Sequence, residues 1–291
     1  MAALLATGGA ASGQAPQAGP VLVPVTVADP LNRFVTGLPQ GAFEVYEDKV
    51  KQNIVSFSRD ERPVSIGIVF DTSASMAGTT ERAGLAVNSL LKTVAPEDEA
   101  FLVETGDRPQ LTVPLTRTFA DIPAQIASVE PKGRTALRDG VYLALATLRK
   151  AANPRKALIV ISDGYDNNSR YTGAEIAGIL KEENVQLYAI AIDMPDAARG
   201  RTADDLIGAE TLRNLAEPTG GRHFVVESLA ELPDVAAKIG IELRSQYVVG
   251  YSPGNQVRDG KYRTIQVRLV PQRGMPAMHA FWRTGYFAPT Q

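Results

Sequence analysis

The sequence contains no cysteine and only two histidines, His223 and His279. The absence of cysteine excludes disulfide bonds, thiolate metal sites and a cysteine nucleophile. With so few histidines, histidine-rich zinc sites and most histidine-based catalysis are nearly excluded as well. Any chemistry of this protein must therefore come from other side chains.

The chain also lacks an excess of charge of one sign, because its formal net charge at pH 7 is -2. Nucleic-acid binding, which selects strongly basic surfaces, is not expected. No basic cluster favours an anionic membrane, and no run approaches the ~20 apolar residues that span a bilayer. With 291 residues, of which 44% are apolar, the chain can bury one large core or two smaller ones.

Residues 1–20 are small, apolar and low in complexity. A short apolar stretch followed by Ala-Ser-Gly-Gln-Ala is similar to the end of a secretory signal peptide. Against this interpretation, no lysine or arginine precedes the apolar stretch, and Pro16 would follow the cut. The sequence leaves two alternatives open, a disordered tail and a signal-peptide remnant.

Residues 61–244 alternate strand-like and helix-like segments, which predicts a doubly wound, mostly parallel α/β domain. Three near-continuous apolar runs have the composition of strands buried on both faces of a parallel sheet. Two shorter strands are expected to form a hairpin around Gly106-Asp107-Arg108. The buried runs are Val64–Phe70, 156–162 and Val185–Ile192, and helices are expected at about 79–94, 119–129, 135–150, 173–183, 208–217 and 229–243.

The two ends of the chain differ from the middle, because residues 21–60 and 245–291 contain strand-like segments without helices. The most economical arrangement pairs the N-terminal and C-terminal strands into one small all-β module, with the α/β domain inserted between them. The strand-like segments are 21–27, 42–46, 53–57, 246–251, 262–270 and 280–287.

Polar side chains follow the buried strands. Asp71, Ser73 and Ser75 come after the first strand, and Asp163 follows the second. Thr135 lies between them and opens a helix. Ligand sites of open α/β sheets lie beyond the carboxyl ends of the strands, so these five side chains are expected at one edge.

Two carboxylates and three hydroxyls form a hard, all-oxygen donor set. Such ligands suit Mg²⁺, Ca²⁺ or Mn²⁺ and select against zinc and copper. Neutral hydroxyls leave the ion much of its positive charge, and few direct protein ligands leave exchangeable water on it. Both properties favour the binding of an anionic group from outside.

The order Asp71-x-Ser73-x-Ser75, Thr135 and Asp163-Gly164 resembles the metal-ion-dependent adhesion site of von Willebrand factor A domains. The resemblance implies Mg²⁺ as the ion, with direct coordination by both serines. It implies direct or water-mediated coordination by the threonine and water-mediated contacts from the two aspartates. The sequence departs from the family at Ala74, where glycine is frequent. Two further carboxylates, Asp139 and Asp166, are candidates for an outer shell or for exposed surface charges.

The terminal segments, including Tyr247-x-x-Gly250-Tyr251, resemble those of bacterial VWFA-related proteins. That resemblance implies a secreted, periplasmic or cell-envelope location. The chemistry of the candidate site and its resemblance to the metal-ion-dependent adhesion site together predict a non-enzymatic, metal-dependent protein-binding module for adhesion or assembly. Its ion would be completed by an Asp or Glu of a partner protein. The alternatives are a scaffold whose metal only braces loops, and a hydrolase that activates water with the ion. The polar segment 193–207 would either shape ligand choice or be plain surface.

Overall fold

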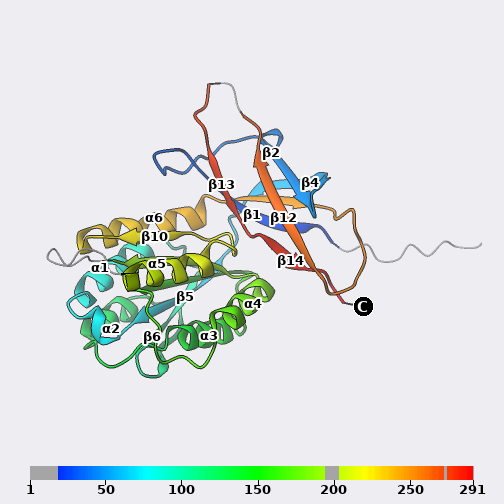
Figure 1. The fold of residues 1–291 in the computed structure, drawn as a ribbon. Coiled ribbons are helices and arrows are strands. Elements are labelled where there is room, and N and C mark those ends of the chain that lie inside the picture. The colour runs from blue at the N-terminus through cyan, green and yellow to red at the C-terminus, as the bar shows by residue number, and fades with distance from the viewer. Residues whose placement is uncertain (1–18, 194–202, 272–273, 291) are drawn as a thin grey trace, which may run out of the picture.

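The computed structural model describes residues 19–193, 203–271 and 274–290 (Figure 1). Its centre is a six-stranded sheet in which only β7 runs antiparallel, paired with β6 as the expected hairpin. The predicted doubly wound, mostly parallel sheet is thereby confirmed. In sheet order the strands are β10 (His223–Val226), β9 (Gln186–Ile192), β8 (Arg155–Ser162), β5 (Val64–Asp71), β6 (Glu99–Thr105) and β7 (Pro109–Thr116).

Three helices cover each face of this sheet, because each helix carries one apolar stripe. One face packs against α1 (Thr80–Leu91), α2 (Asp121–Ser128) and α6 (Leu232–Arg244). The opposite face packs against α3 (Leu137–Leu148), α4 (Gly173–Glu183) and α5 (Ala203–Ala216). Within the described parts of the chain, no helix has the length and apolar character needed to cross a membrane.

Helix α3 begins two residues later than the apolar spacing predicts. Ala136 has a non-helical backbone (φ -106°, ψ 58°), and its N–H donates to the carbonyl of Gly106. The N–H of Thr135 donates to Asn167 Oδ1 instead of entering the helix. These bonds to neighbouring loops place Thr135 in a loop at the edge of the sheet.

The terminal segments form two antiparallel four-stranded sheets. Each sheet combines strands from both ends of the chain, so the expected pairing of the two ends is confirmed. The two sheets enclose a core of their own around Val25, Val45 and Val249. We call this part the β module. One sheet contains β13 (His279–Trp282), β1 (Val21–Ala28), β11 (Tyr247–Tyr251) and β4 (Ile54–Arg59); the other contains β14 (Gly285–Phe287), β12 (Tyr262–Leu269), β2 (Phe43–Glu47) and β3 (Val50–Gln52).

The expected single strand at 280–287 is wrong, because β13 and β14 belong to different sheets. The chain leaves the first sheet at Arg283, which bridges Thr219 of the α/β part. It enters the second sheet at Gly285, where a Cβ atom would lie 2.2 Å from the carbonyl oxygen of Arg263. Only glycine fits that close approach of two backbones.

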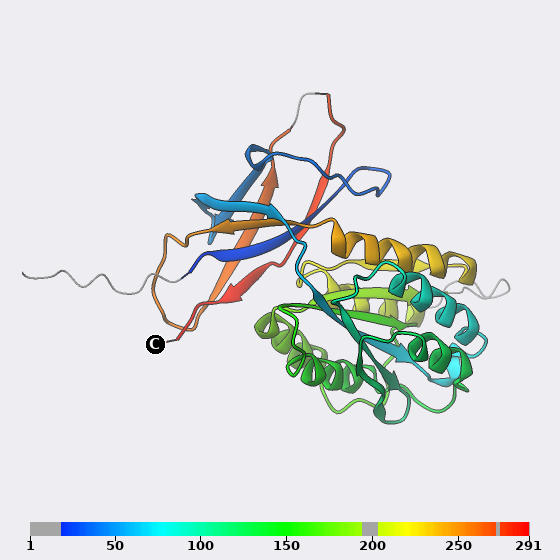
Figure 2. The same cartoon turned by 180° about the vertical axis from the view of Figure 1, so that it is seen from behind.

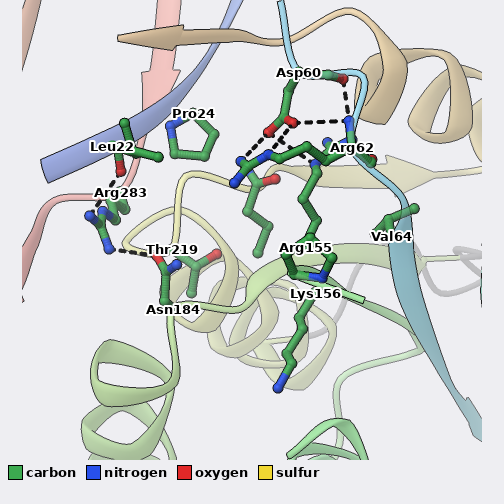
Figure 3. Close-up of a pocket in the computed structure, with 12 residues that line it drawn as sticks. Leu22, Pro24, Asp60, Arg62, Val64, Arg155, Lys156, Asn184, Thr219 and Arg283 are labelled. Carbon is green, nitrogen blue, oxygen red and sulfur yellow. Dashed lines mark hydrogen bonds and ion pairs between the residues drawn. The ribbon is translucent and has the colours of Figure 1, made fainter. Parts of the chain in front are cut away.

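The β module meets the α/β part at the amino-terminal edge of the parallel sheet, where β5 leaves the junction (Figure 2). Arg155, at the start of β8, forms an ion pair with buried Asp60 (Figure 3). Arg155 also donates to Gln246 Oε1. Burial alone would raise the pKa of Asp60, but hydrogen bonds from Arg62 and the charge of Arg155 lower it. The carboxyl edge of the sheet, at the other ends of the same strands, is therefore free of the β module.

Candidate metal centre at the carboxyl edge of the sheet

The five candidate ligands lie on three loops at the carboxyl edge of the sheet. Asp71 is the last residue of β5, and Ser73 and Ser75 follow it in a short 3₁₀ turn. Asp163 directly follows β8. Hydrogen bonds join the loops, because Lys132 N donates to the carbonyl of Thr72 at 2.8 Å and Ala74 N donates to that of Gly133 at 3.3 Å.

Asp71 is fully buried. Its Oδ1 accepts from Ser73 N at 2.9 Å, and its Oδ2 accepts from Ser162 Oγ at 2.6 Å. Burial raises the pKa of Asp71 to about 6, and the negative charge of Asp163 adds to the shift. The two carboxylates therefore share a negative potential that a divalent cation would relieve.

The candidate side chains of these loops differ in their exposure to solvent. Ser73 Oγ lies 3.1 Å from Ser75 Oγ, so the two proposed direct ligands sit side by side. Ser73 and Thr135 are each 2% exposed, whereas Ser75 is open to solvent. Asp163 is half-buried, and its Oδ1 accepts from Tyr165 N at 3.0 Å.

The donor chemistry of these loops fits a hard divalent cation. Among residues 19–193, 203–271 and 274–290, no group of three or more His, Cys, Asp or Glu side chains could hold an ion. A metal at this edge would therefore depend on the hydroxyls as well as the two aspartates, which is a magnesium-type donor set. Ala74 has no positive φ, so the missing glycine does not strain the loop.

Asp139 and Asp166 brace a neighbouring loop. Asp139 is 5% exposed, so it is not an exposed helix carboxylate, and it accepts from the N–H groups of Arg170 and Tyr171. Asp166 Oδ2 accepts from Arg138 N and Nε at 2.8 Å. Burial would raise the pKa of Asp166, but these hydrogen bonds lower it. Both carboxylates tie residues 166–171 to the start of α3.

The structure adds two polar residues that were not among the five candidate ligands. Ser162 donates to Asp71 and accepts from Gly164 N at 2.9 Å, so it couples β5 to the Asp163 loop. Asp193 follows β9 and is 8% exposed. It lines a cavity of about 180 Å³ together with Ser75 and Asp163. Their position in the sequence could have identified both residues, because they stand at the carboxyl ends of buried strands.

The absence of a side chain at Gly164 allows α5 to pack closely against the Asp163 loop of the candidate centre. Its φ is +85°, and a Cβ atom there would lie 2.2 Å from the carbonyl oxygen of Gly208 in α5. A side chain at Gly164 would therefore displace α5 or the Asp163 loop. Residues 194–202, which contain most of the polar segment expected to shape this rim, lie outside the described residues, as does the tail 1–18.

The burial of Asp71 has a consequence for stability without metal. Its pKa is about 6 in the folded protein, against 3.8 for an unperturbed aspartate, so between these pH values the folded state holds a proton that the unfolded chain has lost. Protonation thus favours folding, and the stability due to this group decreases as the pH rises through this window. Two pKa units correspond to about 3 kcal/mol, of which about 1 kcal/mol falls between pH 5 and 7.

Chelator-treated protein is therefore expected to gain about 1 kcal/mol from Asp71 on acidification from pH 7 to pH 5. Urea unfolding at both pH values, in wild type and in Asp71→Asn, isolates this group from all others that titrate. An identical pH dependence in the two proteins would show that Asp71 does not carry the raised pKa.

The fold and these loops together define an open α/β domain with an oxygen-rich centre at the carboxyl edge of its sheet. Residues 66–165 match the family model of the von Willebrand factor type A domain. The chain therefore contains a von Willebrand factor type A domain.

Three similar proteins extend this comparison. A UPF0353 protein of Mycolicibacterium paratuberculosis is 26% identical over 205 residues, which cover 63% of this chain and only 61% of that protein. A von Willebrand factor type A structure from Catenulispora acidiphila covers 95% of this chain and 75% of its own, with 13% identity and a TM-score of 0.53. Proximal thread matrix protein 1 of the mussel byssus covers 68% and 51%, with 20% identity and a TM-score of 0.51. The two structures support the fold.

Proposed function

We propose that this protein is a non-enzymatic, divalent-metal-dependent protein-binding module for adhesion or assembly. The observation that carries the proposal is the pair of adjacent hydroxyls, Ser73 and Ser75, beside the buried carboxylate of Asp71. An octahedral Mg²⁺ held by few protein ligands keeps exchangeable positions. The strongest ligand that a protein partner offers to such a position is an Asp or Glu carboxylate.

Two features of the edge suit binding better than hydrolysis. His223 lies on β10 and His279 on β13, so neither histidine belongs to the three loops of the candidate centre. Asp71 is committed to two hydrogen bonds, which leaves it poorly placed to act as a general base toward a water molecule. A scaffold in which the ion only braces loops is the second candidate, because Ser162 and the loop-to-loop bonds already join these segments.

The thread matrix protein of the mussel byssus has the same fold, which is consistent with a role in assembly. For this chain we propose a secreted, periplasmic or cell-envelope location. This location is supported by the resemblance of the terminal segments to bacterial VWFA-related proteins. It is tested by fractionating cells and probing each fraction with an antibody against the β module.

Partner binding is expected to require Mg²⁺ and to be more sensitive to Thr135 than metal binding is. The 2%-exposed Thr135 belongs to a loop held by Asn167, and we propose that its hydroxyl matters most when a partner carboxylate occupies the ion. Thr135→Ala should then weaken partner binding about tenfold or more, while the magnesium affinity changes less. Ca²⁺ should support partner binding less well, since its longer bonds fix a carboxylate less firmly.

The measurement is affinity capture from cell-envelope extracts in Mg²⁺ and in EDTA, followed by surface plasmon resonance with the purified captured protein. Wild type and Thr135→Ala are compared in Mg²⁺, Ca²⁺ and EDTA. Thr147→Ala, near the C-terminal end of α3, is the matched control. Equal binding in EDTA and Mg²⁺ would place recognition elsewhere, whereas loss of the fold in EDTA would favour the scaffold.

A further inference from the structure

A groove of about 750 Å³ lies beside the candidate metal centre. Its walls come from three segments: the tip of the β6–β7 hairpin, the first turns of α3 and the loop before α4. The residues that line it include Arg108, Tyr142, Leu143, Arg170 and Tyr171. We call it the tyrosine groove, after its two tyrosines. The volume of the groove lies within the range that is typical of ligand-binding pockets in proteins.

The groove is physically continuous with the loop that carries Thr135. Asn168, which also lines the groove, donates from its backbone N–H to the Thr135 carbonyl at 3.0 Å and from Nδ2 to the Asp107 carbonyl at 2.7 Å. On the other side, Arg134 N donates to Asp107 Oδ1 at 2.8 Å. Since an extended chain advances about 3.3 Å per residue, a peptide anchored at the centre reaches the groove within a few residues.

The aromatic part of the groove is built in advance. The rings of Tyr142 and Tyr171 stack with centroids 4.3 Å apart and an interplanar angle of 24°. Buried Asp139 fixes this arrangement by accepting from the N–H groups of Arg170 and Tyr171. Both tyrosines are half-buried, so they present a rigid, partly open aromatic surface. Such preformed tyrosine surfaces are typical of the energetic centres of protein interfaces.

The charge around the groove suits an acidic partner. The side chain of Arg170 is 86% exposed, so its ion pair with Asp139 is weak and its guanidinium remains accessible. Of the charged residues that line the groove and are exposed, two are cations, Arg108 and Arg170, and one is an acid, Asp107. This excess favours the approach of a negatively charged segment.

We propose that the tyrosine groove is a second binding subsite, which receives an aromatic side chain from an acidic, extended segment of the partner protein. The Asp or Glu of the same segment occupies the metal centre, so the inference rests on the proposed function. The groove then selects among the many segments that carry a carboxylate. Recognition requires both the ion and an aromatic residue at a short, fixed spacing from the acid.

The test uses a library of random peptides of about ten residues, which extend to about 33 Å, each with one central Asp. Binding is measured in Mg²⁺ and in EDTA. In Mg²⁺, wild type should select Phe, Tyr or Trp at one side of the Asp. Tyr171→Leu keeps an apolar side chain against α3 but removes the aromatic face. This variant should lose the aromatic selection and should bind the selected peptides about tenfold more weakly. Tyr171→Phe should keep both properties.

Tyr46→Leu, on β2 of the β module, is the matched control and should behave as wild type. Circular dichroism and magnesium titration of Tyr171→Leu should also match wild type. Metal-dependent binding that needs the Asp but shows no aromatic preference, or equal binding by Tyr171→Leu, would overturn the subsite and leave the proposed function standing. Peptide binding that is identical in EDTA and independent of the Asp would overturn both.

Discussion

Replacing Asp71 with asparagine is expected to abolish the magnesium binding that calorimetric titration should detect as one site in chelator-treated wild type. The substitution removes the charge of one of the two candidate carboxylate ligands while keeping the shape of the side chain. Loss of a group that orients a metal site costs about 10–100-fold in affinity, and loss of its charge adds to this. Ser73→Ala should have a comparable effect, because it deletes a proposed direct ligand.

Both variants should remain folded by circular dichroism. Asparagine at position 71 still accepts a hydrogen bond from Ser73 N through its Oδ1. Its amide nitrogen then presents a donor, in place of a carboxylate oxygen, toward Ser162 Oγ. Asp121→Asn and Ser58→Ala, at exposed positions of α2 and β4, are matched controls. Unchanged magnesium affinity in Asp71→Asn would refute the metal centre, and global unfolding of both variants would favour the scaffold.

Deleting one end of the chain alone is expected to abolish folding of the β module and to cause aggregation. Strand β1 lies between β11 and β13, and β2 lies between β12 and β3. Removal of residues 1–59 would strip β11 and β12 of these partners and expose the module's apolar core. Removal of residues 247–291 would do the same to β1 and β2. Unpaired edges next to apolar faces are a recognised route to aggregation.

Deleting both ends should restore solubility, if residues 61–244 form an independent folding unit as we propose. A chain of residues 60–246 retains Asp60 and Gln246, the polar partners of buried Arg155. Size-exclusion chromatography and circular dichroism compare the three deletions with the full chain. Soluble, cooperatively folded single-end deletions would contradict the pairing, and an aggregated 60–246 chain would show that the two parts fold as one unit.

The sequence by itself determined the α/β class, since the apolar runs at Val64–Phe70 and Val185–Ile192 are nearly continuous. Such runs are stable only when both faces are covered by helices. It also predicted that the terminal strands pair with each other, because neither end has enough strands to form a core alone. The polar residues that follow the buried strands were readable for the same reason, since parallel strands bring their carboxyl ends to one edge.

Only the tertiary structure decided where β13 ends and β14 begins, because that break depends on a contact between Arg283 and Thr219, distant in sequence. It also decided the late start of α3, which follows from hydrogen bonds of Thr135 and Ala136 to two other loops. The roles of Ser162, Asp139 and the stacked tyrosines were likewise beyond local patterns. Burial and hydrogen-bond partners are properties of distant segments brought together, and no periodicity within one segment encodes them.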